Sequence, residues 1–160
     1  MEKSTGDTLK VFQFKLSNVL ICVDIKYIIK VLPLVELEPV PLSQPYLAGM
    51  MNFAGKSIPT IDLAIALGLD RKNSYTVDTP LLLCTNGSDE MAVIVDSVQG
   101  IETINAGQIQ MRDEFKKENP FFLGTVIVAD VQLLLIDMHK IFLQFLSHVN
   151  VVSTSLTDDK

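Results

Sequence analysis

Hydrophobic and polar positions along the chain predict short β-strands rather than long helices. LKVFQFKL (9–16) alternates apolar and polar residues, as a strand with one buried face does. VLICVDI (19–25) follows a turn at Ser17-Asn18. Long helices are excluded from the next segment by four prolines, because each removes a backbone donor and fixes φ: Pro33, Pro39, Pro41 and Pro45.

A hairpin and a short helix are expected next. PYLAGMMNF (45–53) and KSIPTIDL (56–63) flank Ala54-Gly55, a suitable tight turn. DLAIALGL then reads as a short helix, because Asp62 is a good N-cap and Gly68 lies near the end.

The second half repeats the strand-and-turn pattern. TPLLLCT (79–85) and MAVIVDSV (91–98) flank Asn86-Gly87, which predicts a tight turn with positive φ at both positions. FFLGTVIVAD (121–130) and VQLLLID (131–137) predict another hairpin. Between these hairpins, INAGQIQMRDEFKKENP (104–120) is polar and is expected to be a long surface loop.

The chain ends in a predicted amphipathic helix, HKIFLQFLSHV (139–149). One face of it is apolar: Ile141, Phe142, Phe145, Leu146 and Val149. This face either covers the mouth of a barrel, which we favour, or offers Phe142 and Phe145 to a partner. Polar tails are expected at 1–8 and 153–160. Closely spaced strands joined by turns indicate a sandwich or small barrels.

The chain carries signs of an internal duplication. LAGMMNFAGKSIPTIDLAIAL (47–67) aligns with FLGTVIVADVQLLLIDMHKIF (122–142), 75 residues later. Four identities result: Gly49 with Gly124, Ala54 with Ala129, Ile61 with Ile136 and Asp62 with Asp137. ICVDIKYIIKV (21–31) aligns with VIVDSVQGIET (93–103) at an offset of 72. Two blocks in the same order favour two similar β-subdomains over chance similarity, and each must close or pair to remove its edges.

Charge and cysteine content narrow the possible functions. The net charge of −6 argues against binding to nucleic acid or to anionic membranes, which needs basic patches. The chain opens without the pattern of a secretory signal, and no apolar run is long enough to span a bilayer. Cys22 and Cys84 lie in apolar, strand-like contexts and are expected to be buried free thiols. The cytoplasm is the expected compartment.

Catalytic, cofactor and metal chemistry find little support in the sequence. Gly55-Lys56-Ser57 resembles the end of a phosphate-binding loop, but the spacing from Gly49 is wrong and Pro59 prevents the helix that must follow. His139 and His148 lack metal-ligand spacing. Asp62 and Asp137 could form a carboxylate pair, although helix capping explains both better. The residues alone indicate a non-catalytic β module that binds proteins, without a cofactor.

Four ordered stretches resemble the CheW-like coupling domain of bacterial chemotaxis. They are VFQFKLSNVLICVDIKYIIKVLPL, PVPLSQPYLAGMMNFAGKSIPTIDLAIALGL, MAVIVDSVQGI and FFLGTVIVADVQLLLIDMHKIF. The most specific motif is Pro-x-x-x-x-Gly-x-x-Asn-x-x-Gly-x-x-x-Pro-x-x-Asp-Leu. This chain carries it in Pro45 (one residue earlier than in the family), Gly49, Asn52, Gly55, Pro59, Asp62 and Leu63.

The resemblance implies a mainly β fold of two SH3-like five-stranded barrels, with short helices and a C-terminal helix. We expect one domain over residues 9–150, with the barrels in its two halves and a boundary near residues 70–78. The implied role is that of a non-catalytic cytoplasmic adaptor. Such proteins join the cytoplasmic tips of chemoreceptors to the regulatory domain of the histidine kinase CheA. A scaffold of a non-chemotactic chemosensory pathway, such as pilus motility, is the alternative.

The resemblance also suggests which residues meet partners. The kinase-contacting region falls near Ile28, Gly49 and Gly124, and the receptor groove between the barrels near Ala54, Val98 and Ile101. The two glycines could instead serve turns or close packing, and the apolar residues could belong to the core.

Two departures from the family affect the receptor side. Ala54 replaces the family's usual arginine, and Lys30 replaces its usual glutamate. An arginine can hold a carboxylate at two points and alanine cannot, so the partner specificity is expected to differ.

Overall fold

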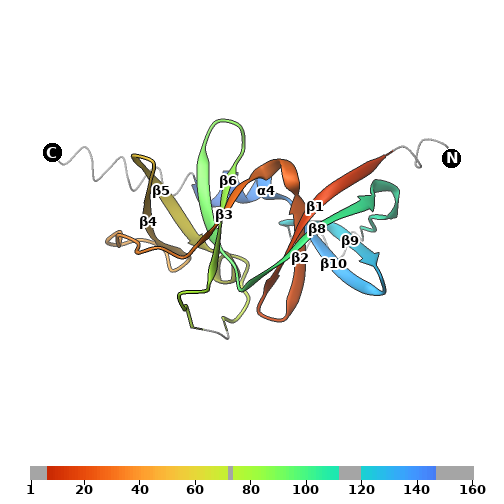
Figure 1. Ribbon diagram of the computed structural model, residues 1–160, viewed down its shortest axis with the longest axis horizontal. Coiled ribbons are helices and arrows are strands. Elements are labelled where there is room, and N and C mark those ends of the chain that lie inside the picture. Colours follow the sequence, from red (N-terminus) through yellow and green to blue (C-terminus); the bar gives the residue numbers. More distant parts are fainter. Residues whose placement is uncertain (1–6, 72–73, 112–119, 147–160) are drawn as a thin grey trace.

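The chain folds into two five-stranded β-barrels that lie side by side (Figure 1). The structure is a computed structural model and describes residues 7–71, 74–111 and 120–146. Barrel A, in the order β8-β1-β2-β10-β9, contains β1 (Thr8–Leu16), β2 (Val19–Asp24), β8 (Ser97–Asn105), β9 (Phe122–Val128) and β10 (Val131–Ile136). Barrel B, in the order β3-β6-β7-β5-β4, contains β3 (Ile28–Pro33), β4 (Leu47–Phe53), β5 (Lys56–Asp62), β6 (Pro80–Thr85) and β7 (Glu90–Ile94).

The helical elements are all short. They are η1 (Ile25–Tyr27), α2 (Leu63–Ala66), η2 (Ala106–Gln108), α4 (Met138–Ile141) and the π-helical turn η3 (Phe142–Leu146). The mainly β fold with two five-stranded units and a short C-terminal helix is thus confirmed. As expected, Asp62 caps α2 by accepting a hydrogen bond from the Ile65 amide at 3.3 Å. Asp137 caps α4 in the same way through the Lys140 amide at 3.2 Å.

The strand order matches the internal duplication but moves the expected division between the barrels. Matching β1–β5 with β6–β10 turns the order of one sheet into that of the other. A boundary near residues 70–78 separates the two copies, yet each barrel combines the first two strands of one copy with the last three of the other. The chain changes barrels after Asp24, where η1 turns it, and again at Val95-Asp96, so barrel B is inserted into barrel A.

Three hydrophobic clusters hold this arrangement together. Barrel A encloses one cluster of six buried residues: Val11, Cys22, Ile104, Val126, Leu133 and Leu135. Barrel B encloses another six: Met51, Ile58, Leu81, Leu83, Ala92 and Ile94. A third and larger cluster contains 21 buried residues from both barrels, α2, α4 and η3, and we call it the inter-barrel core. More buried residues therefore lie between the barrels than inside either of them.

The inter-barrel core explains the composition of the central strands. Cys22 faces the interior of barrel A, whereas its neighbours Ile21 and Val23 belong to the inter-barrel core. Strands buried on both faces need continuous apolar runs rather than alternation. LLLC in β6 and MAVIV at β7 are such runs.

The C-terminal segment covers the inter-barrel core instead of facing a partner. Ile141, Phe142, Phe145 and Leu146 are all buried there, which confirms the predicted apolar face. Val149 and His148 lie outside the described residues, as do both predicted tails except Asp7 and Thr8. The Phe145 ring meets the edge of Tyr46 with centroids 4.7 Å apart and lies 5.4 Å from Phe121. A segment that leaves β10 of barrel A thus reaches barrel B.

Several predicted elements differ from the structure. The Asn86-Gly87 turn contains four residues, and only Gly87 has positive φ, because the Asn86 side chain accepts the amides of Ser88 and Asp89. The predicted strand 91–98 ends at Ile94. The expected loop 104–120 begins with η2, after which Gln110 bridges to Thr125; residues 112–119 lie outside the described part.

We predict that both cysteines react slowly with thiol reagents while the protein is folded. Burial raises the pKa of Cys22 and of Cys84 to about 12, so hardly any thiolate is present at pH 8. With Ellman's reagent, both thiols should react promptly in guanidinium chloride, and almost no reaction should occur without the denaturant. A prompt reaction of either cysteine in the native protein would contradict the burial of that residue.

Candidate protein-interaction surface

The inter-barrel core opens on one side into a strip of exposed apolar side chains. In antiparallel sheets, directly opposed residues lie on the same face. Ile101 opposes Phe12 and Val98 opposes Phe14, and both phenylalanines belong to the inter-barrel core. In barrel B, Ile28 opposes Cys84 and Val31 opposes Leu82, which belong to the same core. We call Ile28, Val31, Val98 and Ile101 the rim residues.

The rim residues lie on β3 and β8, the two edge strands that border the space between the barrels in Figure 1. Ile101 is 58 % exposed, Val31 43 % and Val98 36 %, while Ile28 is half-buried. These side chains are apolar and accessible, and they share sheet faces with residues of the inter-barrel core, which is the character of a surface that another protein can cover. Val98, Ile101 and the predicted kinase-contacting residue Ile28 thus all lie opposite residues of the inter-barrel core. Which partner each of them contacts stays a prediction.

Lys30 and Ala54 lie apart from the rim residues. Lys30 opposes Leu83, which faces the interior of barrel B, so its side chain leaves β3 on the other face from Val31. The Lys30 ammonium lies 5.9 Å from the centre of the Phe53 ring. Ala54 follows at the tip of the β4–β5 hairpin, exposed, with a positive φ of 50°. The structure therefore brings Lys30 close to the Ala54 hairpin but divides the predicted receptor residues between two places.

Gly49 and Gly124 occupy equivalent, crowded positions in the two barrels. Gly49 precedes Met50, which exchanges backbone hydrogen bonds of 2.8 and 2.9 Å with Glu38. Gly124 precedes Thr125, which pairs with Gln110 through two bonds of 2.8 Å. A Cβ atom would lie 2.8 Å from the Glu38 oxygen at Gly49, and 2.5 Å from the Gln110 oxygen at Gly124. Both glycines are buried and admit a crossing chain, so any effect on a kinase contact is indirect.

A buried ionic cluster, centred on Arg71, was missed by the sequence analysis. Its guanidinium binds Asp62 at two points, Nε–Oδ2 at 2.6 Å and Nη2–Oδ1 at 3.0 Å, and Asp96 through Nη1 at 2.8 Å. The Tyr75 hydroxyl also donates to Asp62. Arg71 lies in a polar loop with no recognisable motif, so the only available signal was Asp62, which capping already explained.

The cluster shifts the ionisation of its own members. Burial acts to lower the pKa of Arg71, but the Asp62 hydrogen bond and the charges of Asp62 and Asp96 hold this pKa above its ordinary value. Burial first, and then the Asp62 hydrogen bond, raise the pKa of Tyr75. The guanidinium therefore stays charged and the phenol stays a donor throughout the physiological range.

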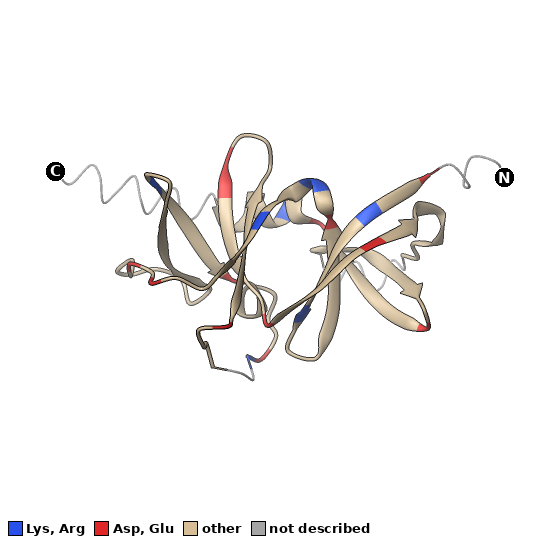
Figure 2. Ribbon diagram, in the orientation of Figure 1, with Lys and Arg blue, Asp and Glu red and all other residues tan. Residues whose placement is uncertain are grey.

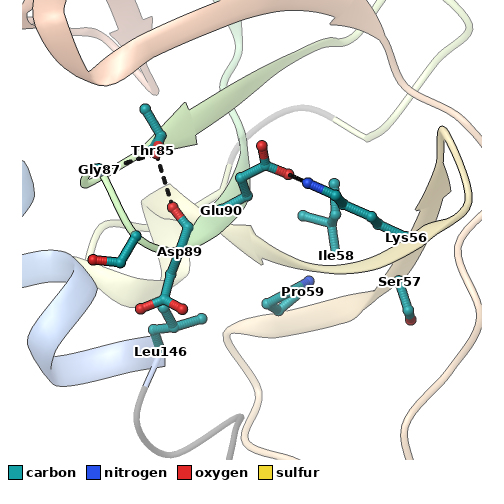
Figure 3. A pocket seen from close by; sticks show the side chains of 10 residues that line it. Lys56, Ser57, Ile58, Pro59, Thr85, Gly87, Asp89, Glu90 and Leu146 are labelled. Atoms are coloured by element: carbon teal, nitrogen blue, oxygen red, sulfur yellow. Dashed lines mark hydrogen bonds and ion pairs between the residues drawn. The ribbon is translucent and has the colours of Figure 1, made fainter.

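Neither a metal-binding cluster nor a phosphate-binding loop is found in the described part of the chain. Those residues contain no group of three or more His, Cys, Asp and Glu side chains placed to hold a metal ion. Figure 2 shows charged residues scattered over both barrels. A polar pocket of about 350 Å³ lies between the start of β5, the β6–β7 turn and Leu146 (Figure 3). There Lys56 starts a strand, not a helix, and its Nζ lies 3.5 Å from Glu90, so the phosphate-loop geometry is absent.

Comparisons with known proteins agree with this architecture. The family model described as the CheW-like domain matches residues 10–145, which is most of the chain. The chain belongs to the CheW-like domain family. No helix among the described residues is long and apolar enough to cross a membrane.

Related proteins align over nearly their whole lengths. "Chemotaxis protein CheW" of Thermotoga maritima is 25 % identical in sequence, and the alignment covers 87 % of this chain and 93 % of that protein. "Chemotaxis protein CheW" of Rhizobium meliloti is 22 % identical, and the alignment covers 86 % of this chain and 90 % of that protein. The crystal structure of the scaffolding protein TtCheW from Thermoanaerobacter tengcongensis superposes with a TM-score of 0.76 at 24 % identity, covering 84 % of this chain and 87 % of that one. This likeness confirms the CheW-like fold.

We predict that Gly124→Ala and Gly49→Ala each destabilise the CheW-like fold. The new methyl group would collide with a backbone oxygen that cannot move without breaking its bridge, so the free energy of unfolding should fall by roughly 1–3 kcal/mol. Urea denaturation followed by circular dichroism measures the change. Gln132→Ala, at an exposed position on β10, is the matched control. Stability equal to that of the control would contradict the prediction, because it would show that the crossing chain moves away from the new methyl group at little cost.

Proposed function

We propose that this CheW-like protein is a non-catalytic adaptor that couples chemoreceptor tips to a CheA-type histidine kinase in bacterial chemotaxis. The observation that carries the proposal is the strip of rim residues beside the inter-barrel core, in a chain that matches the family over residues 10–145. An exposed apolar strip on two edge strands gives a receptor helix a surface on which to pack. An adaptor that acts by contact needs no catalytic residue at this surface.

The proposal includes the distribution of partners over the surface. Val98 and Ile101, with Ile28 and Val31, form the receptor side, and the kinase regulatory domain meets the segments held by Gly49 and Gly124. We place the protein in the cytoplasm, held at receptor arrays through its partners. The named relatives are chemotaxis proteins, which supports this pathway rather than a non-chemotactic one.

We predict that Ile101→Glu weakens binding to a receptor signalling fragment by roughly tenfold or more, because a carboxylate would then be buried against an apolar helix face. Binding to a CheA regulatory domain should change little. Titration calorimetry with each purified partner measures both affinities. Leu42→Glu, at a fully exposed position in the connection between β3 and β4, is the control. Wild-type protein that binds neither partner at micromolar concentration would refute the adaptor function.

We predict that Ala54→Arg combined with Lys30→Glu strengthens binding to a typical receptor tip. Lys30 lies over Phe53, next to Ala54, so the two new side chains come from neighbouring positions. An arginine at a positive φ costs no more than the alanine it replaces, and the lost cation–π contact is worth about 0.5–1 kcal/mol. Affinity for the same receptor fragment is the measurement. An unchanged affinity would show that this hairpin is not part of the receptor-binding surface.

A further inference from the structure

We propose that Arg71 is a positioning residue that fixes barrel A against barrel B and thereby sets the start of β8, where Val98 and Ile101 lie. The effect on partner binding rests on the proposed adaptor function, whereas the effect on barrel geometry does not. Arg71 itself need touch no partner.

The cluster joins elements of both barrels. Asp62 is the last residue of β5 in barrel B, and Asp96 lies at the crossing from β7 to β8. The Asp96 amide donates to the Lys15 carbonyl of β1 at 2.9 Å, and its carboxylate accepts the amide of Ser17 in the β1–β2 turn. The Ser17 hydroxyl donates in turn to the carbonyl of Asp70. Arg71 therefore connects the end of β5 to the β1–β2 turn through Asp96.

The cluster is the directional part of an otherwise apolar interface. The inter-barrel core consists of hydrophobic side chains, whose attraction does not depend on direction. Charge-assisted hydrogen bonds do depend on direction, and the two-point contact of Arg71 with Asp62 is their most specific form. The side chains are only 1 % exposed at Asp62, 7 % at Asp96 and 15 % at Arg71, so solvent screens them little.

The other side of the molecule shows that the fold does not require such a cluster. By the duplication, Asp137 corresponds to Asp62, Asp24 to Asp96 and Leu146 to Arg71. Leu146 is buried in the inter-barrel core beside Phe142 and Phe145. At equivalent positions, one copy is thus held to the rest of the fold by apolar packing and the other by an ionic cluster. The difference marks Arg71 as a feature of this side, where β8 begins.

The position of β8 makes the cluster relevant to binding. Asp96 immediately precedes Ser97, the first residue of β8, and Val98 follows. A rotation of barrel A relative to barrel B would change the separation between the β3 and β8 rim residues. Arg71 therefore acts on the rim residues through its ion pair with Asp96.

The test measures the distance between the barrels directly. Spin labels at Lys10→Cys on β1 and Asn52→Cys on β4, both exposed, report that distance by pulsed electron paramagnetic resonance; the buried native thiols should stay unlabelled. We expect a narrow distribution in the labelled parent and a broad one after Arg71→Met. Arg71→Lys, which keeps the charge and loses the two-point contact, should be intermediate. Lys56→Met, which breaks the exposed pair with Glu90, is the matched control and should stay narrow.

A further variant separates positioning from stability. Asp62→Asn, Arg71→Met and Asp96→Asn together remove the charges that Arg71→Met leaves uncompensated, so the melting temperature should recover. The distance distribution should nevertheless remain broad, and the affinity for the receptor fragment should fall by roughly tenfold. A narrow distribution with parental affinity in this folded variant, or in Arg71→Lys, would overturn the proposal. If the parent itself binds no receptor fragment, the adaptor function fails while the distances still decide the role of Arg71.

Discussion

The apolar packing between the two barrels is the interaction on which the rest of this structure depends. It contains more buried residues than the interiors of both barrels combined, and it draws on every helix that follows a β4–β5 or β9–β10 hairpin. Each small barrel alone would have a thin core, and small cores give marginal stability. The rim residues on β3 and β8 lie opposite residues of this shared core, so the packing between the barrels also positions the candidate binding surface.

The sequence predicted most of the strands well, but β3 and β8 poorly. LLLC and MAVIV are continuous apolar runs because both of their faces are buried. The two glycine-containing hairpins are recognisable instead because buried positions alternate with more exposed ones and a turn follows. β3 and much of β8 have mostly exposed side chains and therefore resemble loops in sequence. These are also the strands that border the candidate binding surface. The exposure that suits them to binding also removes the apolar pattern by which a strand is predicted from sequence.

The functional residues show the same limits. Resemblance to the family placed Val98 and Ile101 on a surface, and strand register then showed that Ile28 and Val31 share it. Lys30 could not be separated from them by sequence, because only the irregular register of β3 decides which face it takes. The Arg71 cluster depends on three residues brought together by the exchange of strands, and neither composition nor spacing contains that exchange.

The insertion of barrel B into barrel A also bears on how the chain is synthesised and folded. Strands β3–β7 are contiguous, so barrel B can close as soon as its last strand has left the ribosome. The β1–β2 hairpin is made first but pairs with β8 and β10, and both of its faces are apolar. Throughout the synthesis of barrel B, this hairpin waits with two open edges. Such contacts between distant residues slow folding and expose the nascent chain to aggregation, so the hairpin is where a chaperone would have most to protect.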